Sequence, residues 1–197
     1  MLSASTAPLK LAVIVASVRE GRFGPTVANW FVKQAGLRDD FEVDVIDLAD
    51  HELPYVLSQQ PSAEVVEALS KVTPRLEQAD AFVVVTPEYN HSFPASLKSL
   101  IDWHYTQWQG KPVGFVSYGG LAGGLRSAEQ LRPIFAELHA VTIREAVSFH
   151  MAWEKFDENG EPKDQSGPAG AAKALLDQLG WWADGLREQR ARRPYGK

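Results

Sequence analysis

Short apolar runs alternate along this chain with segments whose apolar residues recur every three or four positions. The runs are short and rich in β-branched residues, so they predict strands; they cover residues 9–16, 41–48, 81–86, 112–118 and 141–149. The amphipathic segments predict helices over residues 25–36, 65–79, 96–108, 125–138 and 171–190. This alternation is typical of an α/β fold with a doubly wound parallel sheet. We expect five strands in the order 2-1-3-4-5, with helices on both faces.

Prolines and turn-forming residues interrupt this pattern. Pro74 falls inside the second helical segment, where we expect a kink or a restart with Thr73 as the cap. Pro133 predicts a distortion of the fourth helix, and residues 157–170 read as a polar loop. No repeat or long linker divides the chain. We therefore predict a single domain over residues 1–190 and a basic, frayed tail over residues 191–197.

Composition narrows the classes of function. The chain has 197 residues and a formal net charge of −5, which argues against a nucleic-acid partner. It contains no cysteine, and this excludes disulfides, thiolate metal sites and cysteine nucleophiles. The sequence shows neither an apolar run of transmembrane length nor a signal peptide. We expect a soluble, cytoplasmic protein without a membrane partner.

Three loops rich in polar residues and glycine follow the first, third and fourth strands. They cover residues 16–25, 86–96 and 117–127. The three strands are neighbours in the expected sheet, so their loops would converge on one crevice. Ligands bind in such crevices, beyond the carboxyl ends of parallel strands.

The first loop has the composition of an anion site. Ser17 offers a hydroxyl group, and Arg19 and Arg22 offer charged, forked donors. Gly21 and Gly24 allow close backbone approach, and the helix that follows offers free N–H groups, so the loop fits a phosphate. The alternative is a helix-capping serine beside solvated arginines. The glycine spacing matches neither the dinucleotide fingerprint nor the P-loop.

The second loop is suited to a flat ligand. Prolines at both ends stiffen it, so that its backbone groups can meet the edge of a heteroaromatic ring. Tyr89 can pack on a ring, and Asn90 can brace the turn. In the alternative interpretation Glu88 is a solvated acid and Tyr89 covers the core. His91 is interpreted as a surface residue and not as a general base.

The third loop contains Gly119, Gly120, Gly123 and Gly124. Glycines there let the backbone approach a ligand or a subunit closely. The alternative is a plain left-handed turn before the fourth helix.

Together the three loops resemble the NADPH-dependent FMN reductase family, a flavodoxin-like group that includes chromate and quinone reductases. The resemblance rests on SVREGRF at residues 17–23, PEYNHSFPASLKSLIDW at residues 87–103 and SYGGLAGG at residues 117–124, and it spans about residues 10–150. The PEYN segment is the most specific. Ala16 stands where many relatives have glycine, and Arg22 where serine is common. Beyond Phe149 the sequence contains no motif of this family to which a role could be assigned.

The resemblance implies a flavodoxin-like fold with non-covalently bound FMN. The residues implied for the phosphate and ribityl chain are Ser17, Arg19, Arg22, Phe23 and Gly24. Those implied for the flavin ring, largely through their backbone, are Pro87, Glu88, Tyr89 and Asn90. Those implied for the other side of the site are Ser117, Tyr118, Gly119 and Gly120. The resemblance also implies a homodimer or homotetramer, with Lys98, Asp102, Trp103 and Tyr105 near the interface.

The implied activity is that of an oxidoreductase. A hydride would pass from NAD(P)H to N5 of the flavin and then to a small-molecule acceptor, namely a quinone, a free flavin, an azo or nitro compound, or a metal oxyanion such as chromate. No catalytic side chain and no metal are expected, because the cofactor carries the chemistry. Two alternatives stay open, a flavodoxin-type electron carrier and a non-catalytic flavin sensor. A serine hydrolase is disfavoured, because the G-x-S-x-G elbow is missing.

Overall fold

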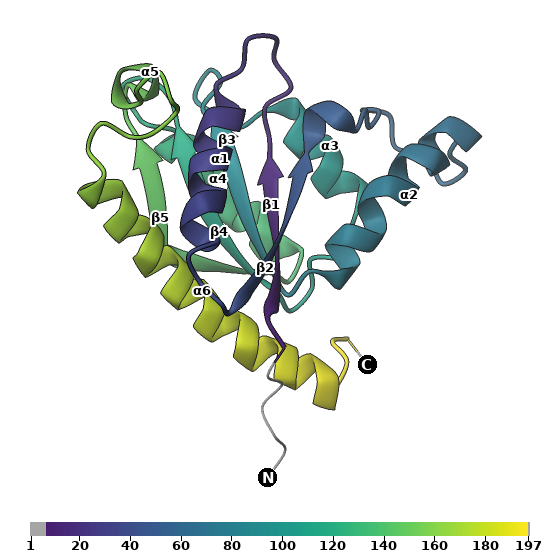
Figure 1. Cartoon of the computed structure of the whole chain (residues 1–197). Coiled ribbons are helices and arrows are strands. Elements are labelled where there is room, and N and C mark those ends of the chain that lie inside the picture. The colour runs from purple at the N-terminus through teal and green to yellow at the C-terminus, as the bar shows by residue number, and fades with distance from the viewer. Residues whose placement is uncertain (1–6, 197) are drawn as a thin grey trace.

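A computed structural model of the protein describes residues 7–196. Its centre is a five-stranded, fully parallel sheet in the order β2-β1-β3-β4-β5 (Figure 1). The strands are β1 (Leu9–Val15), β2 (Phe41–Asp47), β3 (Ala81–Pro87), β4 (Pro112–Tyr118) and β5 (Val141–Phe149). Every residue of β3 and β4 is buried, as expected of strands that are covered on both faces. The predicted fold and strand order are confirmed.

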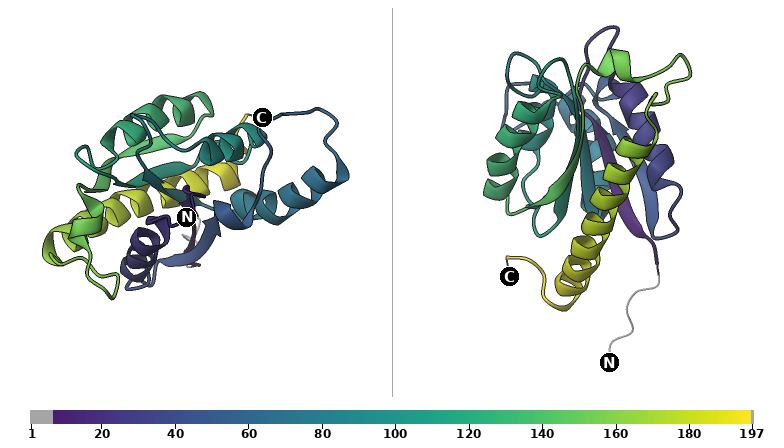
Figure 2. Two further views of the ribbon diagram at one scale, coloured as in Figure 1. Left: turned by 90° about the horizontal axis from the view of Figure 1, so that it is seen from above. Right: turned by 90° about the vertical axis from the view of Figure 1, so that its left-hand side faces the viewer.

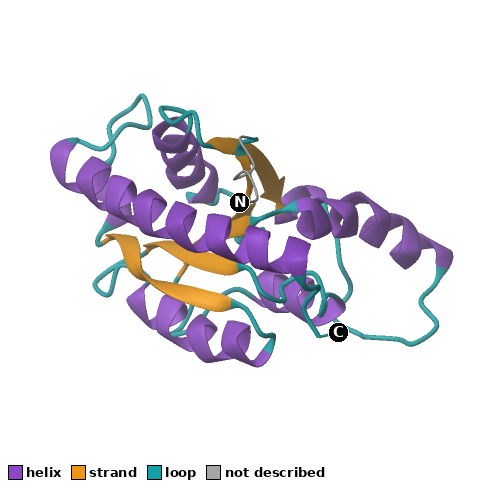
Figure 3. Cartoon of the chain, turned by 90° about the horizontal axis from the view of Figure 1, so that it is seen from below, coloured by secondary structure: helices purple, strands orange, loops and turns teal. Residues whose placement is uncertain are grey.

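Helices cover both faces of the sheet (Figure 2). They are α1 (Gly24–Ala35), α2 (Ala63–Gln78), α3 (Ala95–Trp103), α4 (Leu125–Glu137), α5 (Ala152–Lys155) and α6 (Ser166–Arg192), with a short 3-10 turn, η1, at Leu48–Asp50. Helices α1 and α6 pack on one face, and α2, α3 and α4 pack on the other. The long α6 crosses its face obliquely from β5 toward β1 (Figure 3).

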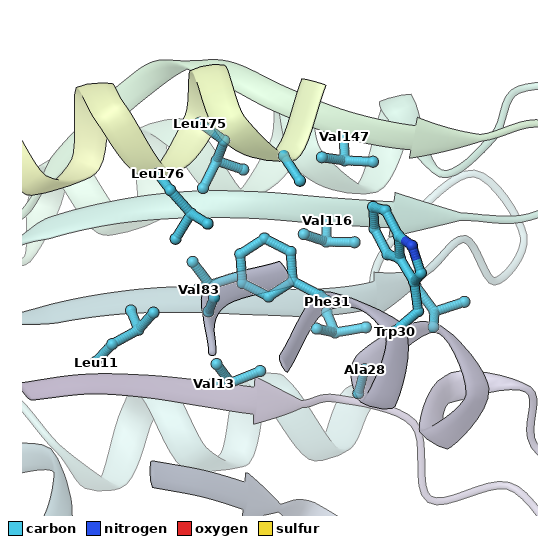
Figure 4. Close-up of a cluster of buried hydrophobic side chains, with 14 of the residues drawn as sticks. Leu11, Val13, Ala28, Trp30, Phe31, Val83, Val116, Val147, Leu175 and Leu176 are labelled. Atoms are coloured by element: carbon cyan, nitrogen blue, oxygen red, sulfur yellow. The ribbon is translucent and has the colours of Figure 1, made fainter. Parts of the chain in front are cut away.

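Two apolar layers hold these helices to the sheet. In the first, Phe31 of α1 lies among Val83 and Val116 of the central strands and Leu176 of α6 (Figure 4). In the second, the indole of Trp108 packs against the Phe82 ring, with 4.8 Å between ring centroids. Burial of such side chains stabilises the fold by about 1.5–3 kcal/mol each. The strands are thereby fixed, and the loops at their carboxyl ends are held on a rigid base.

Two helices continue through an internal proline, and a third ends earlier than predicted. Helix α2 runs without a restart through Pro74 and begins at the cap Ser62, so the expected capping role of Thr73 is wrong. Pro74 lies on the solvent-facing side, where water can satisfy the freed carbonyl. Helix α4 likewise continues through Pro133. Helix α3 ends at Trp103 and not at residue 108, because the His104 side chain donates from Nδ1 to Leu100 O at 2.7 Å.

The last helix is longer than predicted at both ends. It begins at Ser166, because the Asp164 carboxylate accepts hydrogen bonds from the N–H groups of Ser166 and Gly167 and so caps the first turn. It continues to Arg192, and beyond it the Tyr195 hydroxyl lies 3.1 Å from His139 Nδ1. The division of the chain at residue 190 remains a prediction.

A buried lysine joins the start of β4 to the end of α2. Lys111 Nζ donates to Leu76 O at 2.8 Å and to Glu77 O at 2.9 Å, which caps the carboxyl end of that helix. Burial lowers the pKa of Lys111 from 10.5 to about 8. Between these two values the unfolded chain binds more protons than the folded one, so the free energy of unfolding rises with pH across this window.

We therefore expect the stability of the wild type to rise, relative to Lys111→Met, between pH 8 and pH 10.5. The measurement is the urea midpoint of both proteins at several pH values. The other lysines and the tyrosines titrate in both proteins, so their contribution cancels in the difference between wild type and variant. A difference that stays constant across this window would show that Lys111 keeps its ordinary pKa.

Candidate active site

The loops after β1, β3 and β4 lie side by side at the carboxyl edge of the sheet. The Ser17 hydroxyl lies 2.5 Å from the Tyr89 hydroxyl, and this contact joins the first loop to the second. The backbone N–H of Glu88 donates to Tyr118 O at 3.2 Å, which joins the second loop to the end of β4. The structure therefore brings together the three loops that the sequence singles out.

The first loop is braced by one arginine and exposes the other. Arg22 Nη1 donates to Ser17 O at 2.9 Å and to Asp47 Oδ1 at 2.5 Å. The hydrogen bond to Asp47 is the main reason why the pKa of Arg22 is raised. Arg19 is exposed, and within residues 7–196 its guanidinium has no hydrogen-bond or ion-pair partner. Arg22 therefore shapes the loop, whereas Arg19 is free to bind an anion.

The start of α1 lies directly behind this loop. No side chain caps this helix, and its N-cap residue is Phe23. The alternative in which Ser17 caps the helix is therefore wrong; Ser17 is instead fully buried beneath Tyr89. Uncapped N–H groups at a helix start attract anions. Arg19 and the start of α1 together make this end of the first loop electropositive.

The second loop closes as a tight hairpin. Tyr89 N donates to Ser92 O at 2.8 Å, and Ser92 N donates to Tyr89 O at 3.0 Å. Asn90 and His91 between them have φ angles of +49° and +73°, which is the left-handed region that two-residue hairpin turns require. Asn90 thus occupies a turn position that asparagine tolerates, and its bracing role stays a prediction. Both residues are exposed.

Helix α4 holds the second loop in place. Glu88 is not a solvated acid: its side chain is 10% exposed, and Arg126 Nη1 donates to its Oε1 at 2.8 Å. Gln130 donates from Nε2 to His91 O at 2.7 Å and accepts from the Ser92 hydroxyl at 2.6 Å. Arg126 and Gln130 are absent from the sequence-based site. Their spacing of four residues places both on one face of a helix, and this was the signal that could have revealed them.

The third loop contains two glycines in left-handed conformation, Gly123 at φ +58° and Gly124 at φ +80°. The hydroxyl groups of Ser117 and Ser148 both donate to Gly123 O at 2.8 Å. A Cβ atom on Gly124 would lie 2.7 Å from Tyr118 N. The left-handed turn proposed as an alternative is therefore present, and it packs the loop closely against the end of β4.

A buried hydroxyl group lies where the loops meet the start of α1. Tyr118 Oη makes no hydrogen bond of ordinary geometry within the described chain, and it would lie 2.9 Å from a Cβ atom on Gly24. Burial, and then the neighbouring Tyr89, raise the pKa of Tyr118, although the nearby Ser17 hydroxyl counteracts part of this rise. The site therefore holds one buried polar atom that the protein alone leaves unsatisfied.

We expect Tyr118→Phe to raise the free energy of unfolding of the ligand-free protein by about 1 kcal/mol, because an unsatisfied buried hydroxyl group is costly. Tyr89→Phe is the matched control. It breaks the bond to Ser17 and should lower the free energy of unfolding by a similar amount. Urea unfolding of both variants tests this, and a loss of stability in Tyr118→Phe would mean that its hydroxyl has a partner in the folded protein.

A comparison with known protein families matches the part of the chain that contains the three loops. A family model described as NADPH-dependent FMN reductase matches residues 9–154. The chain belongs to this family. The resemblance found in the three loops is thereby confirmed.

Two curated relatives agree with this assignment. An NAD(P)H-dependent FMN reductase of Schizosaccharomyces pombe is 36% identical over 132 residues, which cover 64% of this chain and 64% of the relative. The alignment thus spans less than two thirds of that relative. A quinone reductase of Escherichia coli K12 is 36% identical over 143 residues, which cover 68% of this chain and 73% of the relative.

A solved structure supports the fold. FerB, a flavoenzyme NAD(P)H:(acceptor) oxidoreductase from Paracoccus denitrificans, aligns with a TM-score of 0.66 over 91% of this chain and 98% of its own. At 24% sequence identity this similarity shows the fold alone. Within residues 7–196 no helix is long and apolar enough to cross a membrane, and no cluster of His, Asp and Glu side chains could hold a metal ion.

Proposed function

We propose that this chain is an NAD(P)H-dependent oxidoreductase that uses bound FMN to reduce small molecules, with quinones as the favoured acceptors. The observation that carries the proposal is the meeting of three family-specific loops around an electropositive helix start. The names of the relatives, FMN reductase and quinone reductase, support the donor and the acceptor class. Free flavins, azo and nitro compounds and metal oxyanions are further candidate acceptors.

The residues of the first loop suit the phosphate end of FMN. Arg19 would supply a charge-assisted hydrogen bond, and the N–H groups of Phe23 and Gly24 at the start of α1 would supply further donors. Arg22 and Ser17 are already bonded to Asp47 and Tyr89. In this proposal they hold the shape of the loop around the phosphate and ribityl chain.

The second and third loops suit the flavin ring. Pro87, Glu88, Tyr89 and Asn90 would bind one edge, mainly through backbone groups that the hairpin and α4 hold still. Ser117, Tyr118, Gly119 and Gly120 would bind from the end of β4. The unsatisfied Tyr118 hydroxyl fits a ligand that brings its own polar groups to this point.

Bound FMN supplies the redox chemistry, because its ring can accept a hydride and pass the electrons on. The chain would contribute orientation. The start of α1 would hold the phosphate, and Glu88, Arg126 and Gln130 hold the PEYN hairpin in place. His91 lies exposed in the hairpin turn, and its position gives no support to a general-base role. No protein nucleophile is needed.

We also propose that the protein works as a homodimer or homotetramer. Tyr55 and Val56 are 76% and 79% exposed, and they line one surface hollow with Val65 of α2. Exposed apolar residues that gather in this way are typical of an interface. Sedimentation velocity tests this, and a monomer at micromolar concentration would contradict it. The cytoplasmic location remains a prediction from the sequence.

The decisive experiment is an absorption spectrum of the protein loaded with FMN, taken before and after NADPH is added without oxygen. Bleaching of the flavin band, followed by recovery when a quinone is added, is the expected result. A band that persists with NADPH would support an electron carrier or a flavin sensor instead. If FMN does not bind at all, the proposed site is wrong.

A further inference from the structure

A second hollow lies one strand away from the proposed flavin site. It has a volume of about 390 Å³ and is bounded by the end of β5, the segment that follows α5, and the first turn of α6. Figure 1 shows α5 and the loop after it above the end of β5. Cavities of this size hold small organic ligands. Most of its lining beyond β5 comes from residues after 154, where the family match ends.

The walls of this pocket are apolar and braced. Val147 and Phe149 line it from β5, and Pro162, Pro168 and Ala171 line it from the other side. The Phe149 ring packs against the Phe156 ring at 4.8 Å between centroids, and Phe156 pairs with Pro162 across the loop. Lys163 N donates to Lys155 O at 2.8 Å. The loop is therefore fixed in place before any ligand arrives, and its walls suit a flat ring.

One positive charge at the pocket is not held in a direct ion pair. Lys155 lines the pocket, and within the described residues its ammonium group has no hydrogen-bond partner and no carboxylate within ion-pair distance. Asp164 also lines it, but Asp164 Oδ1 accepts from Ser166 N at 3.1 Å, the Ser166 hydroxyl at 3.0 Å and Gly167 N at 3.3 Å. Its charge caps α6 and also attracts Lys155 from beyond ion-pair distance. Lys155 can still form a closer ion pair with an anion.

His150 also lines the pocket and can accept a hydrogen bond. His150 Nδ1 lies 2.9 Å from Leu121 O, and because a carbonyl oxygen only accepts, Nδ1 carries the proton of the neutral ring. Nε2 therefore keeps its lone pair. A hydroxyl or amine group on a ligand ring would donate to it.

From these features we propose that the pocket binds a planar aromatic carboxylate at a site separate from that of FMN. The ring packs between Phe149 and Ala171, the carboxylate pairs with Lys155, and a ring hydroxyl donates to His150. The backbone bonds from Met151 N to Gly120 O and from Ala152 N to Gly119 O place the site next to the third loop.

Calorimetric titration with 6-hydroxy-2-naphthoate tests the proposal. The neutral isostere 6-hydroxy-2-naphthamide should bind about tenfold more weakly, because it lacks the charge that pairs with Lys155. Lys155→Met should abolish this difference by weakening only the carboxylate. Lys163→Met is the matched control, since it removes the same charge from the same loop outside the pocket, and it should bind both probes as the wild type does.

The position of the ligand needs its own measurement. Amide shifts in the NMR spectrum should change at Gly167 and Ala171, and the affinity should be equal with and without saturating FMN. Competition with FMN, shifts confined to the exposed Trp181 on the outer face of α6, equal binding of the two probes, or no binding at millimolar concentration would each overturn the proposal. Because the titration involves neither NADPH nor turnover, its outcome is independent of the proposed enzymatic activity.

Discussion

Replacing Gly124 by alanine should lower the free energy of unfolding by about 2–5 kcal/mol, a large share of the stability of a domain. The φ angle of +80° costs an L-residue about 1–2 kcal/mol. The new Cβ atom would also lie 2.7 Å from Tyr118 N and 2.9 Å from Tyr118 O. These are backbone atoms of the central sheet, which cannot move aside, so overpacking adds about 1–3 kcal/mol.

The matched control is Gly170→Ala on α6. A Cβ atom there meets no atom within 4 Å, and alanine favours a helix over glycine by about 0.5–1 kcal/mol, so this variant should be slightly more stable than the wild type. Urea unfolding of the three proteins gives the comparison. If Gly124→Ala unfolds at the wild-type midpoint, the third loop does not have the tight turn described here.

Replacing Arg19 by alanine should weaken FMN binding by about 1.5–3 kcal/mol, which is roughly 10- to 150-fold in Kd. Its guanidinium is exposed beside the uncapped start of α1 and has no partner within the described chain. A bound phosphate would therefore gain a charge-assisted bond at no cost to an existing one. Stability should change little, because no internal bond is broken.

Titration of FMN by quenching of its fluorescence measures this effect. Arg144→Ala is the control, since this arginine is 85% exposed on β5 and is bonded only to the neighbouring Glu145. The loss of FMN affinity in Arg19→Ala should become smaller at high salt, because salt screens the charge. An unchanged Kd in Arg19→Ala would remove this residue from the phosphate site and leave the start of α1 as the main anion donor.

Arg22 shows that residue type alone does not distinguish an arginine that binds a ligand from one that braces a loop. In the sequence both arginines of the first loop are equivalent phosphate ligands. In the fold Arg22 is turned back onto Asp47, which follows in β2 and lies far away along the chain. The partner is brought near only by parallel pairing of β1 with β2. A pattern of neighbouring residues contains no information about that carboxylate.

The partners of Glu88 and Tyr89 in the second loop also come from distant segments of the chain. The interpretation of Glu88 as a solvated acid fails because Arg126, on a helix after the next strand, reaches its carboxylate. Tyr89 covers Ser17, because the first and third strands are adjacent. Both contacts cross between loops, and such contacts depend on strand order and register.

The sequence by itself determined the five strands, the longer helices apart from their ends, and the three loops. The spacing of apolar residues reflects burial on one or both faces of an element, which is a local property of the chain. Only the tertiary structure decided which arginine is free, which hydroxyl groups are bonded to each other, and that residues 155–171 form one side of a pocket at the end of β5. These features depend on distances between segments that are far apart in the sequence, and packing alone sets such distances.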